Sequence, residues 1–205
     1  MHRYPPSEPG ERWRLIPCQA RRGRGVSGPS GLPFGDETMH MPAIYFQREE
    51  IKWRDKWRSA AHEAGRATVA YDKGMAFVRA WLYRNEGADL LEETTWLGQA
   101  SWLRTRDHAH EGVIGVAGIV AEAMHINPDV DASEIMDDWY WSNLMPSETD
   151  MASIPDDESE RLDLVDEALG ILRSQKRLFD AIKRHLFCNE ILSDGMLSDM
   201  ADQCA

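Results

Sequence analysis

The sequence is poor in cysteine and has no long apolar run. Its 205 residues include three widely spaced cysteines, Cys18, Cys188 and Cys204, which do not form the pattern of a disulfide framework or a zinc ribbon. We therefore expect reduced thiols and a cytoplasmic location. No stretch approaches the roughly 20 apolar residues of a membrane span, and no apolar segment follows the N-terminal arginines. Neither a membrane helix nor a secretory signal is predicted.

The motifs of several enzyme classes are also missing. The sequence contains no Gly-x-x-x-x-Gly-Lys-Ser/Thr and no Gly-x-Gly-x-x-Gly, so nucleotide binding is not predicted. It also lacks the motifs of serine and cysteine nucleophiles. The net charge is −12, and residues 129–205 carry nineteen acidic against six basic residues. Nucleic-acid phosphates need a basic surface, so no nucleic-acid partner is expected. We interpret this acidic third as the solvated surface of helices.

Tryptophan and methionine are abundant, which predicts a hydrophobic core. The sequence has eight tryptophans and ten methionines, and its length fits one domain. Residues 1–40 differ, because they hold most of the prolines and a Gly/Arg/Ser run at 21–31. Such a segment cannot bury enough apolar surface to fold, so we expect a disordered, passive tail. The domain is expected over residues 41–200, with a second tail at 201–205.

Apolar periodicity predicts a mainly α (α+β) domain with a small sheet. A spacing of three to four residues predicts a long first helix at 43–73, with further helices at 111–125, at 132–145 and from 158 onward. Alternation at 75–83 and the Thr-Thr-Trp run at 94–96 predict strands of a two- or three-stranded sheet after the first helix.

Several single residues refine this outline. Gly74 is predicted to cap the first helix in a left-handed conformation, and Gly65 inside that helix indicates close packing. Asp131 is expected as the N-cap of the helix that follows it. The run Asp156-Asp157-Glu158 is interpreted as a helix N-terminus and not as a metal cluster.

The most informative stretch is His62-Glu63-Ala64-Gly65-Arg66, in the middle of the first helix. A zinc helix of the His-Glu-x-x-His type places two imidazoles on one face, and its glutamate takes a proton from metal-bound water. Here the first histidine and the glutamate are present. Arg66 stands where the second histidine is needed, and a guanidinium has no lone pair for a metal.

Four segments in order resemble the FtsH-type zinc peptidase domain. They are AHEAGRATVAY at 61–71, VAGIVAE at 116–122, SETD at 147–150, and the closing pair from ALGIL at 168–172 to EILSDG at 190–195. The second is similar to the Leu-Ala-Gly-x-x-Ala-Glu helix of that family, and the third to the segment that supplies its third zinc ligand. The resemblance spans about residues 50–200 and includes no ATPase module, so it implies a stand-alone relative.

The resemblance assigns roles residue by residue. His62 matches the first zinc ligand, Glu63 the catalytic general base and Asp150 the third ligand, while Arg66 departs from the second. Zinc is the implied cofactor if the site is functional, and otherwise there is none. The implied partner is a peptide or protein held in the cleft. The sequence gives no oligomeric state.

Three interpretations of Arg66 remain open. In the first, its guanidinium replaces the metal and pairs with Asp150 and with Glu63. In the second, His108, His110 or His125 completes a zinc site. In the third, the likeness is one of fold alone.

The first interpretation implies a catalytically impaired binding or regulatory module, and the second an active zinc peptidase with an altered ligand set. A further hypothesis is a small helical protein that contacts a partner through its acidic third. Glu122, the one charge in the apolar helix, is interpreted as a buried acid hydrogen-bonded to a neighbouring helix rather than as a catalytic group.

Overall fold

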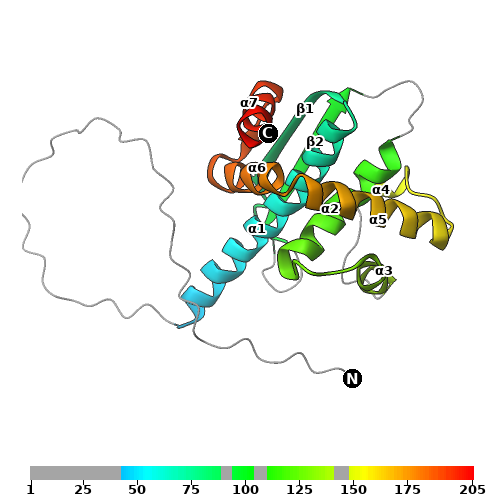
Figure 1. Ribbon diagram of the computed structural model, residues 1–205. Coiled ribbons are helices and arrows are strands. Elements are labelled where there is room, and N and C mark those ends of the chain that lie inside the picture. Colours follow the sequence, from blue (N-terminus) through cyan, green and yellow to red (C-terminus); the bar gives the residue numbers. More distant parts are fainter. Residues whose placement is uncertain (1–42, 89–93, 104–109, 141–147) are drawn as a thin grey trace, which may run out of the picture. The chain divides into compact units, whose positions relative to one another are not determined.

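The computed structural model describes residues 43–88, 94–103, 110–140 and 148–205 (Figure 1). The predicted tail at 1–40 lies outside these residues. The described elements, in chain order, are α1 (Ala43–Asp72), β1 (Ala76–Arg84), β2 (Trp96–Leu103), α2 (Glu111–Ile126), α3 (Ala132–Tyr140), α4 (Glu148–Met151), α5 (Glu158–Ser174), α6 (Lys176–Asn189), β3 (Ile191–Leu192) and α7 (Asp194–Cys204). This arrangement confirms a mainly α domain with a small sheet.

The sheet is antiparallel and has the strand order β2-β1-β3. Trp81 on β1 pairs with Gln99 on β2 and with Ile191 on β3. Within the described sheet β2 therefore has a strand on one side only. Gly74 ends α1 with φ +70°, which confirms the predicted cap and turns the chain back into β1. Helix α1 packs against both long strands.

Helix α2 is the centre of the core, and it packs between α1 and α5. Eleven of its residues are buried. Because protein surrounds most of this helix, its side chains are apolar on nearly all sides. The crossing of α1 and α2 is close at Gly65. A Cβ there would overlap the Cβ of Ala121 and the carbonyl oxygen of Ala117. This confirms that Gly65 marks tight packing.

Helix N-termini follow the predicted caps. Asp131 Oδ1 accepts a hydrogen bond from the backbone N–H of Glu134 at 2.9 Å. Asp157 accepts from the N–H groups of Ser159 and Glu160 and so caps α5, which confirms that the acidic run at 156–158 opens a helix. These carboxylates satisfy helix N–H groups that have no partner inside the helix.

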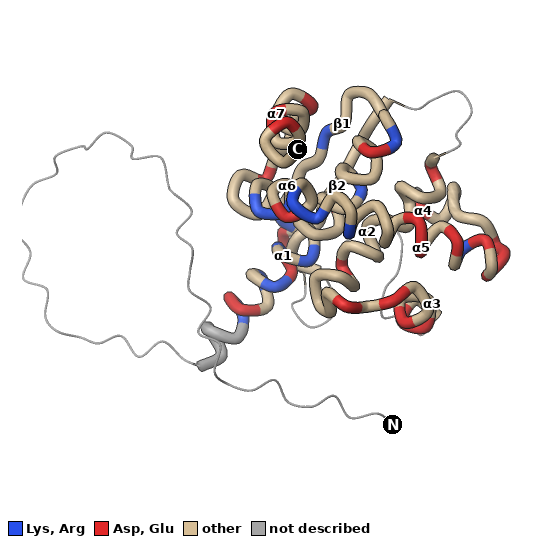
Figure 2. The backbone as a smooth tube through the Cα atoms, viewed as in Figure 1, with Lys and Arg blue, Asp and Glu red and all other residues tan. Residues whose placement is uncertain are grey.

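The acidic third forms a solvated surface on α3 and α5, as predicted (Figure 2). On α5 the acids face outward while Val165, Leu169 and Leu172 face the core. The exposed acids of this helix are Glu158, Glu160, Asp163, Asp166 and Glu167. Their separation from the apolar face is the amphipathic pattern of a surface helix.

The second strand indicated by the Thr-Thr-Trp run at 94–96 is present and spans 96–103. Two expectations differ from the structure. The expected C-terminal tail is instead the end of α7, where Ala201 and Cys204 pack against the core. Cys204 is free, but Cys188 is disulfide-bonded, so the expectation of reduced thiols is wrong for Cys188. Residues 141–145 of the predicted third helix lie outside the described residues, and α3 ends at Tyr140.

In the described ranges, no helix combines the length and the apolar character needed to cross a bilayer.

Candidate functional site

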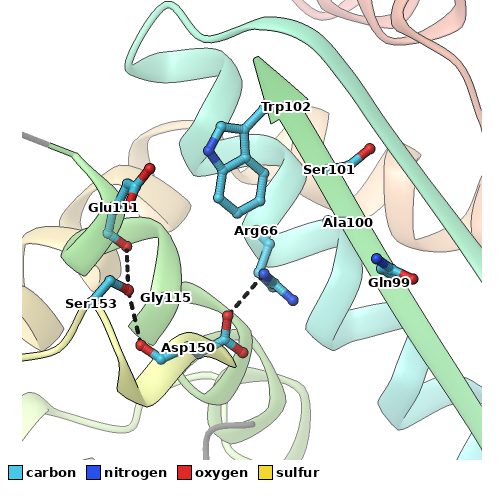
Figure 3. Close-up of a pocket in the computed structure, with 9 residues that line it drawn as sticks. All are labelled: Arg66, Gln99, Ala100, Ser101, Trp102, Glu111, Gly115, Asp150 and Ser153. Carbon is cyan, nitrogen blue, oxygen red and sulfur yellow. Dashed lines mark hydrogen bonds and ion pairs between the residues drawn. The ribbon is translucent and has the colours of Figure 1, made fainter. Parts of the chain in front are cut away.

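Three of the residues that the sequence singled out, Glu63, Arg66 and Asp150, meet in the interior between α1 and α4. Arg66 and Glu63 lie on one face of α1 with 9% and 3% of their surface exposed, and Asp150 on α4 is 3% exposed. Arg66 Nη2 lies 2.8 Å from Asp150 Oδ1 (Figure 3). Arg66 Nη1 lies 3.8 Å from Glu63 Oε2. The predicted pairing of Arg66 with both carboxylates is therefore present.

A serine fixes the short helix that carries Asp150. Ser153 Oγ donates to the carbonyl oxygen of Asp150 at 2.9 Å and lies 3.3 Å from that of Glu111 at the start of α2 (Figure 3). Gly115 on α2 faces the same contact, since a Cβ there would lie 3.1 Å from Ser153 Oγ. The small residue on α2 thus lets α4 approach closely and brings Asp150 to Arg66.

Glu63 lies under the sheet and against Gly98 of β2. A Cβ at Gly98 would overlap the Glu63 side chain, so only glycine fits there. Glu63 Oε2 is buried and has no hydrogen bond within the described residues. Burial raises the pKa of Glu63 and outweighs the opposing effects of His62 and Arg66. This environment favours the uncharged acid.

His62 belongs to a neighbouring ion network centred on Glu122. Its Nδ1 lies 2.7 Å from Glu122 Oε1, and Arg58 donates to Glu122 Oε2 at 2.7 and 3.1 Å. The imidazole packs onto Gly118, where a Cβ would overlap the ring. Glu122 thus joins α2 to α1 through the predicted hydrogen bonds to a neighbouring helix, although its side chain is 14% exposed and not fully buried.

His62 and Glu122 stabilise each other's charged forms. Burial alone would lower the pKa of His62, but the hydrogen bond to Glu122 and the charge of Glu63 outweigh it and raise that pKa. Burial alone would raise the pKa of Glu122, but His62 and Arg58 lower it below its usual value. The two shifts favour an imidazolium paired with a carboxylate.

A pocket of about 200 Å³ opens beside Arg66 (Figure 3). Its lining comprises residues 99–102 of β2, Arg66, Glu111, Gly115, Asp150 and Ser153. The guanidinium carbon of Arg66 lies 5.3 Å from the centroid of the Trp102 ring, within cation–π distance. The edge strand, the buried ion pair and an aromatic face therefore border one small cavity.

The side chains present do not supply the three ligands of a zinc site. Catalytic zinc usually takes three protein ligands, but Arg66 stands at the position that the resemblance matches to the second ligand, and it pairs with Asp150. Of the alternative ligands, His108 lies outside the described residues, His110 stands at the N-cap position of α2 without a side-chain cap hydrogen bond, and His125 stacks on Trp57 with ring centroids 6.0 Å apart. The described ranges contain no group of three or more His, Cys, Asp or Glu side chains placed to hold a metal.

Four residues of this region escaped the sequence analysis: Arg58, Gly98, Trp102 and Ser153. Arg58 lies four residues before His62 on one helix face, so the helical period contained a signal for it. The other three reach the site through strand pairing and helix crossing, which no local pattern reports.

Comparison with protein-family models and with curated proteins found no match to this chain.

Proposed function

We propose that this protein is a zinc-peptidase-like binding module that holds a peptide or protein segment without cleaving it and acts in binding or regulation. The proposal combines the resemblance of its four segments to the FtsH-type peptidase domain with one observation. The resemblance matches Arg66 to the second metal ligand and Asp150 to the third, and the Arg66 guanidinium lies 2.8 Å from the Asp150 carboxylate.

The physical argument concerns charge. A zinc site gathers carboxylates and histidines around a cation, and the loss of one ligand would leave buried acids uncompensated. A fixed guanidinium supplies a positive charge at that place and forms strong hydrogen bonds with a carboxylate. Arg66 therefore balances the buried charge of Asp150 without a metal. The chemistry lost is the activation of water, which a guanidinium does not provide.

The edge of β2 supports binding of an extended chain. An edge strand carries unpaired backbone N–H and C=O groups, and a peptide can add to it as a further strand. Residues 99–102 of this strand line the pocket beside Arg66. A peptide paired with β2 would place side chains next to the buried ion pair.

Metal analysis of the purified full-length protein tests the proposal. We expect no stoichiometric zinc in the parent protein and a gain of one zinc per chain in Arg66→His. A tightly held zinc in the parent would contradict the proposal. Extended peptides should bind the parent and remain uncleaved.

An active zinc peptidase with an altered ligand set is the second candidate, and one observation favours it. His62 donates or shares its Nδ1 proton with Glu122, the outer-shell arrangement that metal-bound histidines use. This candidate requires zinc-dependent cleavage of an unstructured peptide that Glu63→Gln abolishes. Absence of cleavage with zinc supplied would count against it.

A further inference from the structure

Two buried donors on the lining of the pocket make no hydrogen bond. They are Nε of Arg66 and Nε1 of Trp102, and neither has an acceptor in the part of the chain that the structure describes. Arg66 as a whole is 9% exposed. Native proteins pair nearly all such groups. The two donors therefore point to an acceptor that comes from outside the described chain.

The size of the pocket limits what can enter. At about 200 Å³ it is smaller than the roughly 300–1,000 Å³ of typical small-molecule sites. It therefore suits a single side chain better than a whole cofactor. Its border on residues 99–102 favours a side chain that belongs to a peptide paired with β2, because alternate residues of a strand face the same side.

The charges on the lining decide between classes of side chain. An acidic group would meet the carboxylates of Asp150 and Glu111, and a basic group would meet the guanidinium of Arg66. An apolar group would cover the two donors and leave them unpaired, which is unfavourable. A neutral group with an acceptor oxygen avoids all three penalties.

We propose that this pocket binds the side-chain carboxamide of a glutamine or asparagine in an extended peptide, an inference that rests on the peptide-binding function proposed above. The carbonyl oxygen accepts from Trp102 and Arg66. The amide N–H groups face the carboxylates of the lining, whose oxygens each accept more than one hydrogen bond. The pair between Arg66 and Asp150 stays in place.

A guest-position series of peptides tests the inference on the full-length protein. The peptides are acetylated and amidated, share one extended Thr/Val/Ser host sequence, and carry Gln, Asn, Glu, Lys or Leu at one central position. Fluorescence anisotropy gives each Kd. We expect the Gln or Asn peptide to bind roughly tenfold more tightly than the Glu, Lys and Leu peptides.

The outcomes separate the two proposals. Equal affinity for all five peptides overturns the carboxamide site and leaves the peptide-binding function standing. Preference for Glu, Lys or Leu also overturns the carboxamide site. Failure of every peptide to bind overturns both.

A matched pair of variants locates the contact. Trp102→Phe removes the indole donor and should abolish the preference for Gln over Leu. Trp81→Phe makes the same change on β1, outside the pocket lining, and should keep the preference. In the parent, the indole N–H resonance that Trp102→Phe removes should shift with the Gln peptide and not with the Leu peptide. A preference that survives Trp102→Phe, or an unmoved resonance, would rule the site out.

Discussion

Arg66 on α1 and Asp150 on α4 form a buried ion pair with 2.8 Å between Nη2 and Oδ1. Both side chains are almost fully removed from solvent. A pair of this kind is costly to desolvate, but removing one partner is costlier still because the other charge remains buried. The pair therefore makes Arg66 a structural part of the domain.

Replacing Arg66 by methionine tests that role. We expect Arg66→Met to lower the free energy of unfolding by about 3–5 kcal/mol, because it removes the guanidinium that pairs with the buried carboxylate of Asp150. The double variant Arg66→Met/Asp150→Leu should recover part of this loss, since it removes both charges of the pair. Urea unfolding followed by circular dichroism measures both. Lys52→Ala, which removes only an exposed i,i+3 pair with Glu49, is the control and should change stability by less than about 1 kcal/mol. A loss of similar size in Arg66→Met and Lys52→Ala would contradict the account.

Two glutamates of the site should respond differently to the same substitution. Glu63→Gln should change stability by less than about 1 kcal/mol, because burial raises the pKa of Glu63 and its Oε2 makes no hydrogen bond within the described residues. Glu122→Gln should cost about 1.5–3 kcal/mol, because it weakens charge-assisted hydrogen bonds with Arg58 and His62. Chemical denaturation of the two variants side by side gives the comparison. A larger loss of stability in Glu63→Gln than in Glu122→Gln would contradict this account of the two glutamates.

The close crossing of α1 and α2 predicts opposite effects for two helical glycines. Gly65→Ala should destabilise the protein by about 1–3 kcal/mol or more, since the new Cβ overlaps Ala121 and the backbone of Ala117. Gly170→Ala in α5 has no atom within 4 Å of the new Cβ and should stabilise the helix by up to about 1 kcal/mol. Melting temperatures by calorimetry should move in opposite directions. A rise in both would mean that the helices separate easily at Gly65.

The lowered pKa of His125 predicts that the protein loses stability as the pH falls below about 6.5. Burial lowers its pKa, Lys183 and Arg58 add to this, and Glu122 and Asp180 oppose it. Because the folded pKa lies below the unfolded value of about 6.5, the unfolded chain binds more protons between the two values. The contribution of His125 is thus complete above about pH 6.5 and is lost as pH falls toward the folded pKa.

The variant His125→Phe keeps a ring to stack on Trp57 and removes this titration. Its urea midpoint should fall less than that of the parent between pH 7 and pH 5. Parallel pH curves for the two proteins would contradict the assignment, and an NMR titration of His125 would measure its pKa directly.

Much of this domain followed from local pattern. The 3.6-residue period of α1 and α5 indicates which helix faces are buried, because helices repeat side-chain directions at fixed intervals. The alternation at 75–83 predicted the strand β1 but not its buried face, since Phe77 and Tyr83 are exposed. Gly74, Asp131 and Asp157 cap their helices through contacts within a few residues. The pairing of Arg66 with Asp150 was predicted from the resemblance to the peptidase domain.

The tertiary structure alone decided what surrounds that pair. Gly98 meets Glu63, and Trp102 lies over Arg66, because the register of β2 on β1 places the strand beside α1. Ser153 reaches the carbonyl of Glu111 only after α4 has folded back onto α2. The sequence by itself determined the helices, their buried faces and the charge at position 66. The pocket, its unpaired donors and the burial of its carboxylates depend on contacts between segments far apart in the chain, which no local period encodes.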